Sequence, residues 1–340
     1  MLGRTISTHW PRVAATSTVR TNTSSQLTSR SLHIGGQVRT NETEGDLYTE
    51  MTTQIGMFER LIIESQSNCN RSCWFCPRTY DRSGKYLDAK GKSVLSRMPT
   101  EKILDLLDQA RQLNFSGLVG FHHYSEPLLD DRAVQLAREA KKRGMKPYLY
   151  TNGDPMKKNE RLCQEVKHTY ARIVIGLYDY ENDEELGSAK EFWLERLQGA
   201  AVEFNPVGLQ GRGVVSTNAV PRALVPFDSR MSIPDLSYEN APCHRPLIRL
   251  IVQYDGQMCN CCEDTYGAFD LGNIYESSLE ELWFSERHAE ILQHLVLGRR
   301  EHYPLCRDCP MPPTGKSQQP GKRIEIRPRL FSSAVGRGGT

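Results

Sequence analysis

The sequence predicts an α/β protein with a parallel sheet that is either open or closed into a barrel. Short apolar runs alternate with amphipathic helical stretches along most of the chain. Turn residues separate the two kinds of segment. Repeated βα units of this kind build a parallel sheet covered by helices, and they place chemistry at the carboxyl ends of the strands.

The expected strands are short apolar runs, and they cover Leu61–Ser65, Gly117–Tyr124, Pro147–Thr151, Ala171–Tyr178 and Ala201–Val207. The expected helices between them cover Thr100–Leu113, Asp131–Arg143, Lys158–His168 and Glu184–Gln198. Pro99 precedes the first helix and Gly144 closes the second, as helix boundaries favour. The alternation therefore begins near Phe58.

A smaller unit is expected behind this repeat. Prolines interrupt the chain between residues 214 and 242 and indicate a linker. Leu247–Tyr254 and Gln257–Cys262 flank an Asp255-Gly256 turn, so we expect them to pair as a β-hairpin. Ser278–Leu297 is expected to form one helix that begins at a capping serine.

Four segments follow from these patterns: a leader over 1–57, a sheet-and-helix domain over 58–235, a small domain over 236–312 and a tail over 313–340. The leader has neither Asp nor Glu up to residue 41 and is rich in Arg, Ser and Thr. This composition is typical of a disordered segment, of a transit peptide, or of a translation start assigned too early. The tail is rich in Pro, Gly, Gln and Arg and is expected to be disordered.

Composition narrows the class of partner. The 340 residues carry a formal net charge of +2, which gives no basis for a nucleic-acid or acidic-membrane partner. No apolar run approaches the roughly 18–20 residues that a membrane span needs. The chain has 10 cysteines, too few for a disulfide-stapled secreted domain, and most of them lie in tight groups that favour metal binding.

Three cysteines follow the first strand with the spacing C-x3-C-x2-C, namely Cys69, Cys73 and Cys76. Three thiolates on one loop can bind three irons of a four-iron cluster and leave the fourth iron open for a cofactor. A zinc site would use paired cysteines or a nearby histidine, and a disulfide would leave one thiol over. Aromatic residues inside the motif, Phe75 among them, are expected to shield the cluster from solvent.

A second set of cysteines lies in the C-terminal part of the chain, at Cys243, Cys261, Cys306 and Cys309. Four thiolates close a cluster completely, and the same four would equally hold a structural zinc ion. Cys259 and Cys262 are further thiols in the same hairpin. Cys259 lies on the same face of the expected strand as Cys261, so it is an alternative ligand.

The motif C-x3-C-x-aromatic-C after the first strand resembles the signature of the radical S-adenosylmethionine (SAM) superfamily. The resemblance implies a partial (β/α)6 barrel in which Cys69, Cys73 and Cys76 hold a [4Fe-4S] cluster that binds SAM. Cys262-Glu263-Asp264 and Leu271–Ile274 resemble the twitch subdomain, a short form of the SPASM extension. That resemblance implies an auxiliary [4Fe-4S] cluster on the second cysteine set and no third cluster.

The same resemblance suggests residues that bind SAM. Glu126 in Ser125-Glu126-Pro127 matches the family segment that binds the methionyl amine. Phe75, Asn152 in Thr151-Asn152-Gly153, and Arg212 after the fifth strand are expected near SAM, and Arg212 is suited to a carboxylate of SAM or of substrate. Plainer interpretations are a solvated loop carboxylate, a βα turn and a surface arginine.

The resemblance implies an oxidoreductase. The reduced first cluster would cleave SAM, and the resulting 5′-deoxyadenosyl radical would abstract hydrogen from substrate. An auxiliary cluster without an open iron suits an electron acceptor, so an alcohol would become a ketone. The chain resembles the 2-deoxy-scyllo-inosamine dehydrogenase type from about Phe58 to Cys309, which favours a sugar- or aminocyclitol-like substrate.

Two alternatives remain, namely a maturase that modifies a precursor peptide and a passive electron-transfer protein. The expected electron donor is flavodoxin or ferredoxin. Labile clusters require reducing surroundings, so we expect the cytoplasm, or the mitochondrial matrix if the leader is a transit peptide.

Overall fold

Seven strands form one sheet in the order β5-β4-β3-β2-β1-β6-β7. The computed structural model describes residues 57–73, 75–178, 180, 182–207, 241–307 and 309. The strands are β1 (Arg60–Ile63), β2 (Leu118–Gly120), β3 (Lys146–Thr151), β4 (Arg172–Tyr178), β5 (Val202–Val207), β6 (Arg249–Val252) and β7 (Met258–Cys259). Neighbouring strands are parallel except β6 and β7, which are antiparallel. The predicted α/β class is confirmed.

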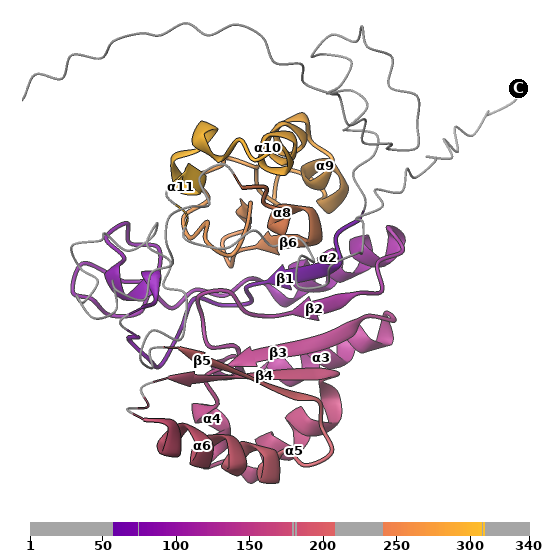
Figure 1. Cartoon of the computed structure of the whole chain (residues 1–340). Coiled ribbons are helices and arrows are strands. Elements are labelled where there is room, and N and C mark those ends of the chain that lie inside the picture. The colour runs from indigo at the N-terminus through magenta and orange to yellow at the C-terminus, as the bar shows by residue number, and fades with distance from the viewer. Residues whose placement is uncertain are drawn as a thin grey trace, which may run out of the picture. The chain divides into compact units, whose positions relative to one another are not determined.

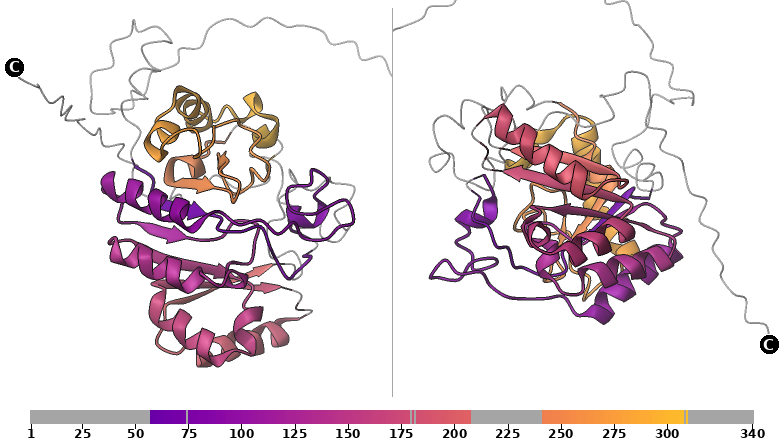
Figure 2. Two further views of the ribbon diagram at one scale, coloured as in Figure 1. Left: turned by 180° about the vertical axis from the view of Figure 1, so that it is seen from behind. Right: turned by 90° about the horizontal axis from the view of Figure 1, so that it is seen from below.

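Helices follow most strands, as the alternation predicts. The α-helices are α2 (Thr100–Gln112), α3 (Ala133–Lys142), α4 (Asp154–Lys157), α5 (Glu160–Thr169), α6 (Asp183–Arg196), α8 (Arg245–Ile248), α9 (Leu279–Trp283), α10 (Glu286–Val296) and α11 (Pro304–Arg307). The short 3-10 helices are η1 (Pro77–Tyr80), η2 (Pro127–Leu129) and η4 (Arg300–His302). Figures 1 and 2 show the C-terminal helices gathered beside β1 and β6, at the opposite end of the sheet from α4, α5 and α6.

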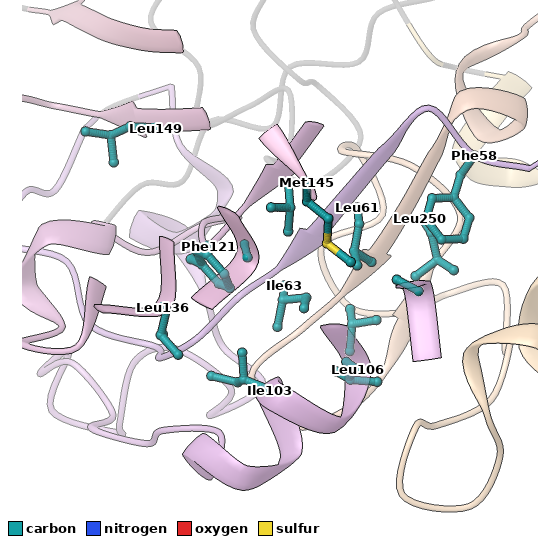
Figure 3. Close-up of a cluster of buried hydrophobic side chains, with 14 of the residues drawn as sticks. Phe58, Leu61, Ile63, Ile103, Leu106, Phe121, Leu136, Met145, Leu149 and Leu250 are labelled. Atoms are coloured by element: carbon teal, nitrogen blue, oxygen red, sulfur yellow. The ribbon is translucent and has the colours of Figure 1, made fainter. Parts of the chain in front are cut away.

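The two faces of the sheet differ, because successive side chains of a strand point to opposite faces. Leu61 and Ile63 of β1 pack with Ile103 and Leu106 of α2 in the main core, which Figure 3 shows. The opposite face, called the inner face below, carries a second small cluster of Ile62, Tyr148, Ile251 and Cys259. The helices therefore cover the outer face, and the inner face is the concave side of a partial barrel.

The C-terminal hairpin forms as predicted, but its first strand also continues the barrel sheet. β6 pairs in parallel with β1 from Arg60↔Arg249 to Ile63↔Val252. All described residues belong to one compact unit. The predicted domain boundaries stay a prediction. The leader up to residue 56, the predicted linker up to residue 240 and the predicted tail over 313–340 lie outside the described residues.

One helix prediction is wrong. Ser278–Leu297 is two helices rather than one, because Ser285 begins a new helix by accepting a hydrogen bond from His288 N at 3.2 Å. The sequence left the capping serine open between Ser277 and Ser278, and the structure shows that Ser278 forms a capping box with Glu281. In the part of the chain that the structure describes, no helix has the length and apolarity to cross a membrane.

Candidate functional site

The first cysteine set lies on the loop between β1 and η1, at the carboxyl edge of the sheet. Cys76 N donates to Cys73 O at 3.0 Å, and Thr79 Oγ1 donates to the same carbonyl at 2.8 Å. Cys69, Cys73 and Cys76 form no disulfide and are partly exposed. Burial raises the pKa of the Cys76 thiol to about 12, so this group needs a bound metal before it becomes a thiolate.

This loop is fastened to the turn after β3. Arg71 donates to Asp154 through Nε–Oδ2 at 2.5 Å and Nη2–Oδ1 at 2.8 Å. Asn70 Nδ2 donates to Asp154 Oδ2 at 3.2 Å, and Asn152 Nδ2 donates to Asn70 Oδ1 at 2.9 Å. Sequence reasoning missed Asn70, Arg71 and Asp154, because side chains about 83 positions apart leave no spacing signal.

Glu126 precedes η2 and is 2% exposed. Its Oε1 accepts from Thr151 Oγ1 at 2.6 Å and from Leu128 N at 3.1 Å, and its Oε2 accepts from Asn152 N at 2.8 Å. Burial raises the pKa of Glu126 to about 7 against the effect of these hydrogen bonds. Because Oε2 receives one donor in the structure and has a second lone pair, this carboxylate is suited to a ligand ammonium group.

The other predicted SAM-binding residues differ in their placement. Phe75 packs against Tyr178 with ring centroids 5.1 Å apart, beside the cysteine loop. Asn152 Oδ1 accepts from Asp154 N at 2.9 Å, and its amide nitrogen holds the loop, so the side chain positions the loop. Arg212 lies outside the described residues.

The second cysteine set lines one cavity in the C-terminal unit, with Cys243, Cys261, Cys306 and Cys309 all on its wall. None of the four forms a disulfide. Burial raises the pKa of the Cys261 and Cys306 thiols, and neighbouring cysteines raise it further. Arg245 and Arg300 line the same cavity, where their charge offsets that of thiolates.

The two alternative ligands lie elsewhere. Cys259 is buried in the inner-face cluster, away from the four-cysteine cavity. Cys262 Sγ lies 3.5 Å from Arg245 Nη1 and 3.7 Å from Arg249 Nη1. The structure therefore places Cys261, rather than either neighbour, with the predicted ligand set. The ligand assignment itself stays a prediction.

The donor chemistry of the two cysteine sets fits iron–sulfur clusters. Three thiols on one loop can bind three irons of a cluster, and four thiols around one cavity can bind four.

Known proteins resemble this chain in sequence and in fold. Residues 243–310 match SPASM, an iron-sulfur cluster-binding domain. The S-adenosyl-L-methionine-dependent 2-deoxy-scyllo-inosamine dehydrogenase of Niallia circulans is 26% identical over 264 residues, which are 74% of this chain and 93% of that protein. The crystal structure of BtrN in complex with AdoMet and 2-DOIA has a TM-score of 0.58 at 22% identity, covering 75% of this chain and 93% of BtrN. BtrN in an open conformation gives 0.52 at 22% identity, covering 75% and 92%.

The structural similarity to BtrN confirms the predicted fold. The SPASM match supports an iron–sulfur cluster rather than zinc for the second cysteine set. SAM and iron–sulfur clusters are the cofactors, as the cysteine spacing and its resemblance predict. The chain therefore resembles the SAM-dependent dehydrogenase of Niallia circulans over most of its length, and its residues 243–310 match the SPASM iron-sulfur cluster-binding domain.

Proposed function

We propose that the protein uses SAM and two [4Fe-4S] clusters to oxidise an alcohol of a sugar- or aminocyclitol-like molecule. The observation that carries the proposal is the pair of cysteine sets in one compact unit, three thiols on the loop after β1 and four around a cavity. The Niallia circulans relative, a SAM-dependent dehydrogenase, is similar over 93% of its length. That coverage supports a dehydrogenase rather than a passive electron carrier.

When bound, the first cluster and SAM supply one-electron hydrogen abstraction, and the second cluster supplies a one-electron acceptor. The protein's own part is to hold and orient these groups. Cys69, Cys73 and Cys76 would hold three irons of the first cluster, which would leave one iron for SAM. Glu126 Oε2 would receive the methionyl ammonium, and the Arg71–Asp154 ion pair fastens the cysteine loop to the turn after β3.

The inner face supplies hydrogen-bonding groups for substrate hydroxyls. The His122 ring contacts Tyr148 edge-on with centroids 5.0 Å apart, and its Nδ1 is buried with no hydrogen-bond partner in the described structure. Burial lowers the pKa of His122 to about 3. A base this weak stays neutral at pH 7, so His122 serves as a hydrogen-bond partner and not as the proton acceptor.

The test is anaerobic reconstitution followed by iron counting and an assay of 5′-deoxyadenosine formed from SAM with dithionite. We expect about eight irons per chain, four for each cluster. Alanine at Cys69, Cys73 and Cys76 should abolish deoxyadenosine formation and remove about half of the iron. Cys163→Ala is the matched control, because this buried thiol of α5 belongs to neither set.

Sugars and cyclitols are then screened for oxidation that consumes SAM and depends on the second cysteine set. A ketone product that disappears in Cys306→Ala supports the dehydrogenase. A fully loaded protein that forms no deoxyadenosine with any of these compounds would contradict the proposal.

A further inference from the structure

Two arginines lie on the inner face at the amino ends of adjacent strands. Arg60 is the first residue of β1, Arg249 is the first residue of β6, and the two are direct register partners on adjacent parallel strands. Neighbouring strands lie about 4.8 Å apart, so the two side chains leave the sheet next to each other. Strand alternation places them on the face of Ile62 and Ile251, opposite the helices.

These arginines lack a counterion. Within the described ranges, neither Arg60 nor Arg249 forms an ion pair with a carboxylate, whereas Arg172 at the start of β4 pairs with Glu203. Arg249 Nε is buried without a hydrogen-bond partner. Burial and the Arg249 charge lower the pKa of Arg60, and Glu59 opposes this only weakly. Two adjacent guanidinium groups held partly out of water are costly unless an anion accompanies them.

The surroundings add positive charge and hydrogen-bond donors. Arg245 Nη1 and Arg249 Nη1 both lie within 3.7 Å of Cys262 Sγ, so a third guanidinium adjoins the pair. Burial lowers the pKa of His122, and the positive charges of Arg249 and Arg60 lower it further. Arg60 and Arg249 are themselves partly exposed, which leaves them accessible to a ligand.

Two carboxylates near the inner face, Glu64 and Glu126, already accept hydrogen bonds from the protein. Glu64 accepts from Tyr86 Oη at 3.0 Å and from Tyr124 N at 2.8 Å. Glu126 is taken by the turn after β3 and by the role proposed for it with SAM. Glu263 lines the four-cysteine cavity together with Arg245, and its Oε2 is buried without a hydrogen-bond partner in the described structure. Glu64 and Glu126 are therefore not available to a substrate ammonium group, and Glu263 lies on the side of the four-cysteine cavity.

We infer that Arg60 and Arg249 bind a phosphate or carboxylate group of the substrate, so that the oxidised alcohol belongs to an anionic polyol rather than to an uncharged or amino-bearing ring. This inference rests on the proposed function. Adjacent guanidinium forks match the paired oxygens of phosphate and carboxylate. The anionic end of the substrate lies at the amino ends of β1 and β6, and the reacting carbon points toward the carboxyl edge where SAM binds.

The first test compares ligands that share one ring. Cluster-loaded protein with SAM is titrated anaerobically, by calorimetry, with glucose, glucose 6-phosphate, glucuronate and glucosamine. We expect an anionic member to bind at least about 10-fold tighter than glucose, as hydrogen bonds to charged groups allow. Comparison of glucose 6-phosphate with glucuronate shows whether the arginines prefer a phosphate or a carboxylate. Equal binding of all four, or a preference for glucosamine, overturns the inference.

The second test changes the arginines. Arg60→Gln and Arg249→Gln should each weaken binding of inorganic phosphate, or of the preferred anionic ring, about 10- to 100-fold. Arg161→Gln makes the same charge change on the exposed surface of α5, where Arg161 pairs with Glu165, and should bind like the wild type. Arg249→Lys guards against misfolding, because it keeps the charge and should retain part of the affinity. If Arg60→Gln and Arg249→Gln both bind the anion as tightly as the wild type, the inference is overturned.

The outcomes separate the inference from the proposed function. Arginine-dependent anion binding without deoxyadenosine formation would support the anion site and contradict the dehydrogenase. SAM cleavage and alcohol oxidation with no preference for anionic rings would support the dehydrogenase and contradict the anion site.

Discussion

Loss of the Arg71–Asp154 ion pair is expected to loosen the three-cysteine loop while the barrel stays folded. Asp154→Ala removes two hydrogen bonds from Arg71 and one from Asn70, together with an ion pair to Lys157 within α4. The Arg71 and Asp154 side chains are 21% and 25% exposed, so water replaces part of what is lost. Hydrogen bonds to charged groups contribute about 1.5–3 kcal/mol each, and with this replacement we assign about 2 kcal/mol to the set. That free energy corresponds to about a thirty-fold change in the loop's opening equilibrium.

The pH dependence of this ion pair has a definite sign. The Arg71 hydrogen bond holds the pKa of Asp154 below its usual value. The contribution of the pair to stability is therefore complete above the usual aspartate pKa, and it is lost as the pH falls through the lowered value. At pH 7 the ion pair is fully formed, so the assay is carried out at pH 7.

The assay is the rate at which reconstituted protein releases iron to a chelator, followed by the loss of cluster absorbance without oxygen. In Asp154→Ala the phase that belongs to the first cluster should become about thirty-fold faster, with the second phase unchanged. Asp105→Ala is the control, because its pair with Lys102 lies on the exposed side of α2. Equal release rates in Asp154→Ala and wild type, or an equal acceleration in Asp105→Ala, would refute the role of the anchor.

Three further predictions concern the cofactors and the turn after β3. Cys261→Ser should lose about four irons per chain, whereas Cys262→Ser should keep them; the reverse result on iron analysis would reassign the ligand. Because burial raises the pKa of Glu126 to about 7, SAM affinity should rise as the pH increases through 7, and Glu126→Gln should bind SAM weakly with a flat pH profile in equilibrium dialysis. Gly153→Ala should cost more stability than the about 1–2 kcal/mol of a left-handed alanine, since a Cβ there would lie 2.5 Å from a buried tryptophan ring. Gly144→Ala is the control, because its φ of 79° is similar but its Cβ would meet open space. In thermal unfolding, Gly153→Ala should therefore have a lower Tm than Gly144→Ala.

Local patterns made the cluster sites predictable from sequence. The spacing of Cys69, Cys73 and Cys76 and their place after a strand identify a three-thiol loop without knowledge of the fold. Glu126 was found through the resemblance of Ser125-Glu126-Pro127 to a family segment, together with its place after the next strand. Cys261 was one of several candidate thiols, and the structure favours it because it faces the cavity that Cys259 does not reach.

Long-range features were not predictable. The partnership of Arg71 with Asp154 depends on how the turn after β3 meets the cysteine loop, which no periodicity encodes. The register that puts Arg60 beside Arg249 joins positions far apart in the sequence. Ser285 was missed for a different reason, since a serine within an apolar helical pattern is consistent both with a continuous helix and with a new N-cap.

The pairing of β6 with β1 has a consequence for the way the protein is made. During synthesis β1 leaves the ribosome early, but its partner on one side does not emerge until the chain has passed residue 252. Until then β1 presents an unpaired strand edge, which invites association with other chains. The nascent protein therefore needs protection for most of its translation, and a chain that ends before β6 should aggregate rather than fold into a smaller barrel.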